Sequence, residues 1–343
     1  MPASVNRFFL PDLLAISAAF KDALNPHWKR AAAESKQWVN SYNVFSDRRR
    51  AFFYKGQSEL LAAHAYPYAE YEEFRTVCDF INLLFVIDEM SDLQGCDDAR
   101  KTGEIYLHVM RNPEWDHGSK LAAMTRAFRE RLTRTIKPGT FRRFLQHGQD
   151  YIDCVVEEAG LRERGDVLDL ESYLVLRREN SAVRLCFGLI PYVLGIDLPE
   201  EVYEDPGLQR IYFAGVDMVC WANDLYSYNM EQASGLAGNN FITVLMQTKG
   251  LTLQQASDYT EEHYRSLMQT FVQESRNLRS FGPTVDPDVK RYVEAMQHWP
   301  IGNIVWSFET PRYFGPSRET ILKTREVILK PVEKDEDEPL SLV

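Results

Sequence analysis

The sequence predicts an all-α protein built as a single helical domain. Apolar residues recur at steps of three and four along most of the 343-residue chain, and glycine and proline interrupt this pattern only at long intervals. No segment shows the convincing alternation of a half-buried strand. The length suits one sizeable core. We therefore expect one bundle of roughly ten or more helices.

Helical periodicity between these glycines and prolines sets the expected elements in chain order. The expected helices cover about residues 10–24, 27–43, 70–92, 97–111, 118–135, 139–162, 168–178, 181–194, 207–232, 251–280 and 286–299. After them, the charged run Glu333–Glu338 is typical of a solvated, disordered segment. We therefore expect one folded domain over residues 1–330 and an acidic tail over 331–343.

The predicted helix over 70–92 carries the first candidate site. Its core-facing stripe, which includes Ile81 and Phe85, continues onto Asp88 and Asp92. Carboxylates four residues apart lie about 6 Å apart on one helix face, where they repel each other unless a cation lies between them. Oxygen ligands of this kind suit Mg²⁺. The alternative is an ordinary solvated acidic face, which the position on the apolar stripe disfavours.

The predicted helix over 207–232 carries the second candidate site. Residues 214–222 are apolar nearly all round, as in a buried helix, and Asn223, Ser227 and Glu231 then follow at steps of four. An amide oxygen, a hydroxyl and a carboxylate in this spacing form a straight ladder of ligands that leaves octahedral positions for water and phosphate oxygens. Polar groups aimed inward are costly unless paired or metal-bound, so the two helices together predict a metal site.

Composition excludes several classes of function. The net charge of −11 argues against binding a nucleic-acid backbone, although divalent cations can reverse the local field for a small anionic substrate. The longest apolar runs, Ile81–Ile87 and Leu185–Val193, are shorter than the about 20 residues of a membrane span. The N-terminus carries no recognisable secretory signal, and the five scattered cysteines suit reduced thiols. We expect a cytoplasmic protein.

The two candidate sites resemble the metal motifs of a known family. DEMSD (88–92) is similar to the aspartate-rich motif, and NDLYSYNME (223–231) is similar to the Asn/Ser/Glu triad, of class I terpene synthases. The longer stretch NDLYSYNMEQASG is especially similar to basidiomycete sesquiterpene synthases. The resemblance spans roughly Phe74 to Tyr313. It implies one helical domain whose two motifs face each other across a cavity and hold three Mg²⁺ ions with the substrate diphosphate.

The resemblance also assigns residues by position. Arg177 lies 46 residues before Asn223, in the place of the family's diphosphate-sensing arginine. Asn180 then takes the place of the linker residue, and Ser181 that of the neighbouring effector at a helix break. Arg178 is adjacent to Arg177, and the choice between the two arginines stays open.

Near the C-terminus, Arg312-Tyr313 resembles the family's RY pair, which donates hydrogen bonds to the diphosphate. The sequence departs from the common pattern in two places. Glu89 stands for the second aspartate of the first motif, as in other fungal members, and Gln232 stands where related enzymes often have a lysine.

These assignments imply an electrostatic mechanism. The metal ions, the sensing arginine and the RY pair would stabilise the negative charge that leaves with the diphosphate. Aromatic faces would stabilise the carbocation by about 0.5–2 kcal/mol each. Phe85 is the first candidate, followed by Trp306 and Phe308, and ordinary core packing is the alternative for each.

The expected reaction is ionisation and cyclisation of farnesyl diphosphate, with 1,11-closure to a protoilludene-like sesquiterpene. A 1,10-closing cadinene- or germacrene-type cyclase and an inactive helical binding relative are the alternatives, and either a monomer or a homodimer is compatible. A chain-elongating prenyltransferase typically carries two aspartate-rich motifs, and a class II cyclase needs a DxDD motif that the sequence lacks. A di-iron bundle needs two Glu-x-x-His elements, and only Glu114/His117 fits that spacing.

Overall fold

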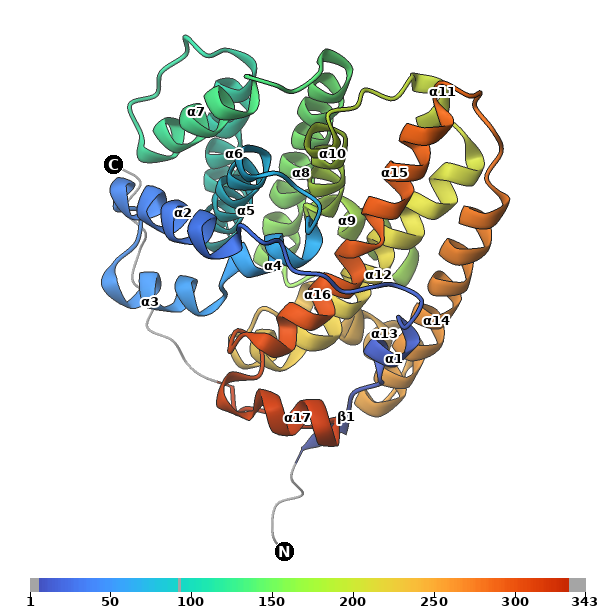
Figure 1. Cartoon of the computed structure of the whole chain (residues 1–343). Coiled ribbons are helices and arrows are strands. Elements are labelled where there is room, and N and C mark those ends of the chain that lie inside the picture. The colour runs from blue at the N-terminus through green and yellow to red at the C-terminus, as the bar shows by residue number, and fades with distance from the viewer. Residues whose placement is uncertain (1–5, 92–93, 333–343) are drawn as a thin grey trace, which may run out of the picture.

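The computed structural model describes residues 6–91 and 94–332 and confirms the all-α fold (Figure 1). The α-helices in this part of the chain are α1 (Leu13–Ile16), α2 (Trp28–Tyr42), α3 (Asp47–Lys55), α4 (Ser58–Ala65), α5 (Tyr71–Ser91), α6 (Cys96–Arg111), α7 (Lys120–Leu132), α8 (Pro138–Arg164), α9 (Leu170–Asn180), α10 (Val183–Leu194), α11 (Glu200–Tyr203), α12 (Pro206–Ala233), α13 (Phe241–Lys249), α14 (Leu253–Asn277), α15 (Asp286–Met296), α16 (His298–Glu309) and α17 (Arg318–Thr324). Two short 3₁₀ helices, η1 (Ala237–Asn239) and η2 (Gly315–Ser317), complete the helical elements.

Most predicted helices are observed within a few residues of their expected ends. The prediction of a helix over 10–24 is wrong beyond Ile16. There the buried Ser17 hydroxyl bonds the Tyr264 hydroxyl of α14 at 2.9 Å, and the chain turns away. The predicted segment 286–299 runs across two helices, α15 and α16, which meet at Gln297. Helices α3, α4, α11, α13 and α17 were not predicted.

Two short strands, which the sequence did not predict, are also present. Strands β1 (Arg7–Phe9) and β2 (Glu326–Ile328) pair antiparallel, with Phe8 opposite Val327 and both of these side chains buried. Three-residue strands are too short to show a period of two. The pair joins the two ends of the described fold, next to α17 at one edge of the molecule (Figure 1).

Helix α12 is the central element of the bundle. Residues 214–222 are buried throughout, as the sequence predicted, and the helix packs against α14, α16 and α13. The last turns of α12 are tied to the C-terminal strand region. Asn229 donates to the Ile328 carbonyl and accepts from the Lys330 amide, and Gln232 Nε2 donates to the Lys330 carbonyl at 2.8 Å.

A sharp break separates α9 from α10. Ala182 takes a left-handed conformation with φ of 59°, which is uncommon for a residue with a side chain. The Ser181 hydroxyl secures the break by accepting from the Val183 amide and donating to the Arg178 carbonyl, both at 3.2 Å. The helix break expected at Ser181 is therefore present.

The remaining global expectations concern the tail, the membrane and the cysteines. The predicted boundary near Lys330 falls just after β2, and the acidic residues 333–343 lie outside the described residues. No helix in the described ranges is long and apolar enough to cross a membrane. All five cysteines are free thiols.

Candidate active site

The helices enclose a cavity of about 210 Å³ whose lining changes from apolar to polar. The apolar end is formed by Leu61, Ile81, Leu84, Val183, Cys186, Val219, Trp299 and Asn303. The polar end is formed by Asp88, Arg177, Asn223, Ser227, Glu231, Arg312 and Tyr313. Along both α5 and α12 the change follows the chain direction, because the polar residues come one to three turns after the apolar ones. The cavity thus pairs an apolar wall with a charged one.

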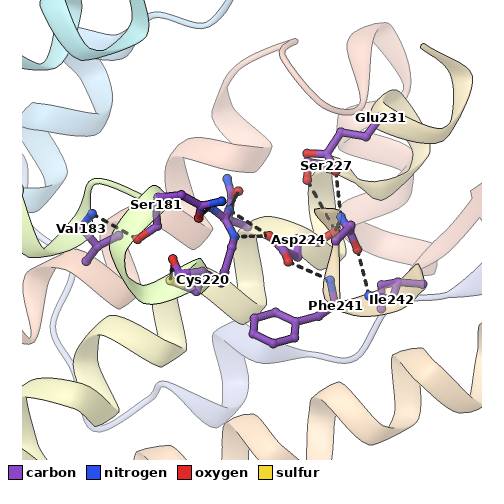
Figure 2. Close-up of polar contacts among 12 residues, drawn as sticks. Ser181, Val183, Cys220, Asp224, Ser227, Glu231, Phe241 and Ile242 are labelled. Atoms are coloured by element: carbon purple, nitrogen blue, oxygen red, sulfur yellow. Dashed lines mark hydrogen bonds and ion pairs between the residues drawn. The ribbon is translucent and has the colours of Figure 1, made fainter. Parts of the chain in front are cut away.

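The triad predicted on α12 lines the polar end. Asp224, Ser227 and Glu231 lie one above the other along this helix in Figure 2, and Asn223 precedes them. Neighbouring side chains already orient two of the triad oxygens. Asn240 Nδ2 donates to Glu231 Oε2 at 2.9 Å, and Asn223 Nδ2 donates to the Tyr313 hydroxyl at 2.8 Å while its Oδ1 accepts from Arg177 Nη2 at 2.8 Å.

Asp88 of α5 lines the same cavity, whereas its predicted partner Asp92 lies outside the described residues. Burial raises the pKa of Asp88, and the positive charges of Arg312 and Arg177 oppose that shift. Burial, followed by the negative charge of Asp224, raises the pKa of Glu231 to about 7.

The residues at the polar end fit a hard divalent cation. Asn223, Ser227, Glu231 and Asp88 supply carboxylate, amide and hydroxyl oxygens, the ligand types that Mg²⁺ prefers. The pKa values of Asp88 and Glu231 are raised because burial destabilises the charged carboxylates more than their neighbours stabilise them. Cations held at these carboxylates would supply that compensation and lower their pKa values.

The structure distinguishes Arg177 from Arg178, between which the sequence could not choose. Arg177 lines the cavity and donates from Nε to Asp224 Oδ1 and from Nη2 to Asn223 Oδ1, each at 2.8 Å. Arg178 turns the other way and forms a bidentate pair with Asp217 at 2.7 and 2.6 Å. Only Arg177 of the two can reach a ligand in the cavity.

Asp224, the residue after Asn223, is buried. It does not line the cavity, but it holds the arginine that does. Its carboxylate also accepts from the Tyr173 hydroxyl at 3.0 Å and from the Phe241 amide at 2.8 Å (Figure 2). Asp224 therefore fixes Arg177 against α12.

Asn180 and Ser181 both line the cavity at the α9–α10 break. Arg177 Nη1 donates to Asn180 Oδ1 at 3.2 Å, so the predicted sensing arginine contacts the predicted linker residue directly. Cys220 Sγ lies 3.7 Å from the Arg177 carbonyl and connects the last turn of α9 to α12.

The RY pair follows α16 and reaches the polar end. Tyr313 is bonded to Asn223, and Arg312 lies 3.8 Å from the Glu89 carboxylate. The Arg312 side chain is only 9% exposed, and its Nε has no hydrogen-bond partner among the described residues. A buried, incompletely paired guanidinium is suited to an anionic ligand.

Two of the three predicted aromatics line the cavity between its ends. The Phe85 and Trp306 rings are 6.3 Å apart, and the Arg312 guanidinium lies 4.7 Å above Phe85. Trp306 Nε1 is satisfied by the Gly56 carbonyl at 2.7 Å. Phe308 does not line this cavity, because it packs on the other side of α16 among aromatic rings.

Sequence reasoning missed several lining residues, all from helices without a recognised motif: Tyr151, Glu158 and Arg162 of α8, Asn239 of η1, and Trp299 and Asn303 of α16. Glu158 and Arg162 belong to the charged stretch EEAGLRER, which resembles a solvated helix end. The i, i+4 spacing of Glu158 and Arg162 on one helix face was the available signal. Gln232 faces away from the cavity and bonds the Lys330 carbonyl.

A helical bundle that brings a triad, an aspartate and two arginines to one end of an otherwise apolar cavity defines the class I terpene synthases. The profile of terpene synthase family 2, C-terminal metal binding, matches residues 79–270. With this match and the close relatives below, the chain belongs to the terpene synthase family and is an enzyme of the lyase type.

Two relatives match nearly the whole chain. A Coprinopsis cinerea protein named linoleate 10R-lipoxygenase COP4 is 51% identical, over 96% of this chain and 95% of its own length. The bifunctional terpene synthase Agr4 of Cyclocybe aegerita is 48% identical, over 98% and 97%. Further fungal relatives, 34–39% identical, are named sesquiterpene synthases.

Solved structures support the fold. The linalool/nerolidol synthase of Streptomyces clavuligerus superposes with a TM-score of 0.76 at 20% sequence identity, covering 84% of this chain and 98% of that one. At this identity the match shows the shared helical fold.

Proposed function

We propose that the enzyme is a sesquiterpene synthase that ionises farnesyl diphosphate with Mg²⁺, cyclises the resulting cation and releases diphosphate. The observation that carries the proposal is the polar end of the cavity. There α5, α9, α12 and the segment after α16 bring oxygen ligands and two arginines together beside an apolar wall. The names of the fungal relatives support a C15 substrate.

The metal ions would be held by Asp88 on one side and by Asn223, Ser227 and Glu231 on the other. Bound there, they would neutralise the diphosphate and make it a better leaving group. Arg177 now donates to Asn223 Oδ1, the oxygen that a cation would take. A cation held by Asn223 would compete with Arg177 for this oxygen, and an Nη2 freed in this way could donate to the diphosphate.

Arg312 and Tyr313 would bind the diphosphate from the opposite side. Both are buried, so their hydrogen bonds to an anion act with little screening by water. Asn223 orients the Tyr313 hydroxyl, and the Phe85 ring supports the Arg312 guanidinium. These donors are in place before the charge develops, as electrostatic stabilisation of a leaving group requires.

The apolar end would hold the isoprenoid chain and exclude water from the cation. Phe85 and Trp306 lie between this end and the polar residues, where their faces can stabilise positive charge close to the ionised carbon. The released diphosphate is the proposed acceptor of the final proton, because the lining offers no histidine in the described residues.

The lipoxygenase name of one relative does not transfer to this chain. Non-haem iron oxygenases bind the metal with imidazole and carboxylate side chains together. The described lining of the cavity contains no histidine, and its donor set is made of oxygens. These residues fit Mg²⁺ and a diphosphate.

The test is incubation of the purified protein with farnesyl diphosphate, with Mg²⁺ or with EDTA, followed by gas chromatography–mass spectrometry of the organic layer. A C15 hydrocarbon or alcohol that requires Mg²⁺ supports the proposal. Products only from geranyl or geranylgeranyl diphosphate would replace the C15 assignment. No product from any of the three would contradict the function and favour an inactive binding relative.

The same chromatogram tests the ring closure. We keep 1,11-closure to a humulyl cation and a protoilludene-like product as the proposal. A 1,10-closure would instead give cadinene- or germacrene-type products. A cytoplasmic location is likewise part of the proposal, in keeping with the five free thiols.

A further inference from the structure

Helix α8 contributes a carboxylate to the cavity that belongs to neither metal motif. Glu158 lines the polar end and accepts a hydrogen bond from Asn180 Nδ2 at 2.7 Å. The other face of the same amide, Asn180 Oδ1, accepts from Arg177 Nη1 at 3.2 Å. One asparagine therefore bridges an anion on α8 and a cation on α9.

The two partners together fix the orientation of the Asn180 amide. An ionised carboxylate only accepts hydrogen bonds, so the Asn180 amide must present its NH₂ group to α8. Its oxygen is then turned to Arg177, which only donates. Without Glu158 the Asn180 NH₂ group loses its partner on α8, and Arg177 alone holds the amide, so the amide and the guanidinium bonded to it are less constrained. Asn180 is 8% exposed, so water has little access to replace the lost partner.

Helix α8 is itself anchored to the end of α5 that carries the aspartate motif. One turn after Glu158, Arg162 Nη2 donates to the carbonyl oxygen of Ser91 at 2.7 Å and to that of Gln94 at 3.2 Å. Glu158 thus holds the end of α9 relative to a helix that is fixed beside Asp88. The chain of contacts connects the first metal motif with the sensing arginine.

We propose that Glu158 is a positioning residue that, through Asn180, holds the Arg177 guanidinium in the orientation in which it receives the substrate diphosphate. The inference rests on the proposed function only for the identity of the substrate. Its structural content is that Glu158 acts through Asn180 and is neither a metal ligand nor an isolated surface charge.

The first experiment measures binding and needs no turnover. Calorimetric titration with inorganic diphosphate in the presence of Mg²⁺ would compare the wild type with Glu158→Ala, Asn180→Ala and the double variant. Glu157→Gln is the matched control, because Glu157 is the exposed neighbour on the same helix. We expect about 5- to 10-fold weaker binding for each single variant and no further loss in the double variant. Additive losses, or wild-type binding by Glu158→Ala, would overturn the proposal.

The second experiment measures turnover and products. Glu158→Ala should lower kcat for farnesyl diphosphate about 10-fold and raise KM by no more than the loss in diphosphate binding, and it should raise the share of uncyclised products, because Arg177 is misplaced during ionisation. Glu158→Gln, which keeps the volume, should recover part of kcat. Equal losses of kcat and thermal stability, without a product change, would show a merely structural role. A wild type that binds diphosphate but consumes no prenyl diphosphate would refute the proposed function and leave the binding result standing.

Discussion

Different interactions position the side chains at the two ends of the cavity. At the polar end several side chains are positioned by single hydrogen bonds between elements, as Arg177 is by Asp224, Tyr313 by Asn223 and Glu231 by Asn240. At the apolar end the lining side chains are positioned by packing in the hydrophobic core, and the Nδ2 of Asn303 has no hydrogen-bond partner among the described residues. A side chain that is held by a hydrogen bond depends on one partner, whereas a packed side chain is held by contacts with many neighbours. We therefore expect substitutions at the polar end to change rates and those at the apolar end to change products.

The largest expected effect is loss of a triad ligand. Glu231→Gln keeps the volume and the bond from Asn240 but removes the charge that would hold a cation. We expect kcat/KM for farnesyl diphosphate to fall about 10³-fold and the Mg²⁺ concentration for half-maximal rate to rise. Steady-state assays over a Mg²⁺ titration would measure both. Wild-type Mg²⁺ dependence in this variant would contradict the assignment of Glu231 as a ligand.

The adjacent arginines give the next contrast, since one faces the cavity and the other does not. Arg177→Lys should lower kcat/KM about 10²-fold, because an ammonium cannot replace the three directed bonds of the guanidinium. Arg178→Lys should leave kcat/KM within about 3-fold and lower the melting temperature, because it loses the bidentate pair with Asp217. Parallel kinetics and thermal melts would compare the two. Equal kinetic losses would mean that Arg178 also acts in catalysis.

At the apolar end, Asn303→Leu is expected to change the product mixture with kcat within about 3-fold. Asn303 is 2% exposed, and its Nδ2 lacks a hydrogen-bond partner in the described residues. Removing such an amide leaves no partner unsatisfied, so thermal stability should be unchanged or higher. Product ratios by gas chromatography would show the effect. An unchanged mixture would weaken the comparison between the two ends.

The smallest expected effect is on stability, at the α4–α16 contact behind the apolar end. His64 lies 2.8 Å from Asp22 and 3.1 Å from Glu309. Burial lowers its pKa, but the hydrogen bonds and charges of the two carboxylates outweigh burial and raise the pKa above its ordinary value. The resulting stabilisation is fully present below the ordinary pKa of about 6.5 and is lost as pH rises through the raised value.

His64→Gln should therefore lower the free energy of unfolding by about 1 kcal/mol or less at pH 5.5, because both carboxylates are partly exposed. The loss should be smaller at pH 8.5. Denaturant melts at the two pH values would test this, and the same loss at both would show that packing rather than charge is responsible.

The sequence was most informative where a pattern repeats within one helix. Asn223, Ser227 and Glu231 could be predicted because steps of four place them on one face of a helix that is otherwise apolar. Arg177 and Arg178 could not be distinguished, because adjacent helical residues point about 100° apart and the deciding partner, Asp217, lies on another helix.

Glu158 was missed for a related reason. Its role depends on contact between α8 and the end of α9, which no local pattern reports. The short helices α3, α4 and α13 were missed because a segment of about two turns shows too little periodicity to predict a helix. Tertiary packing decides such segments.

The β1–β2 pair has a practical consequence. Asn229 and Gln232, on either side of Glu231, bond the backbone of Lys330 just after β2, so the end of the described chain lies beside the last turns of α12. Because β1 pairs with β2, the N-terminal segment leaves from the same place. An enzyme that makes prenyl diphosphates, fused at either end, would be tethered near the polar end of the cavity. A short linker there would raise the local substrate concentration without any new contact.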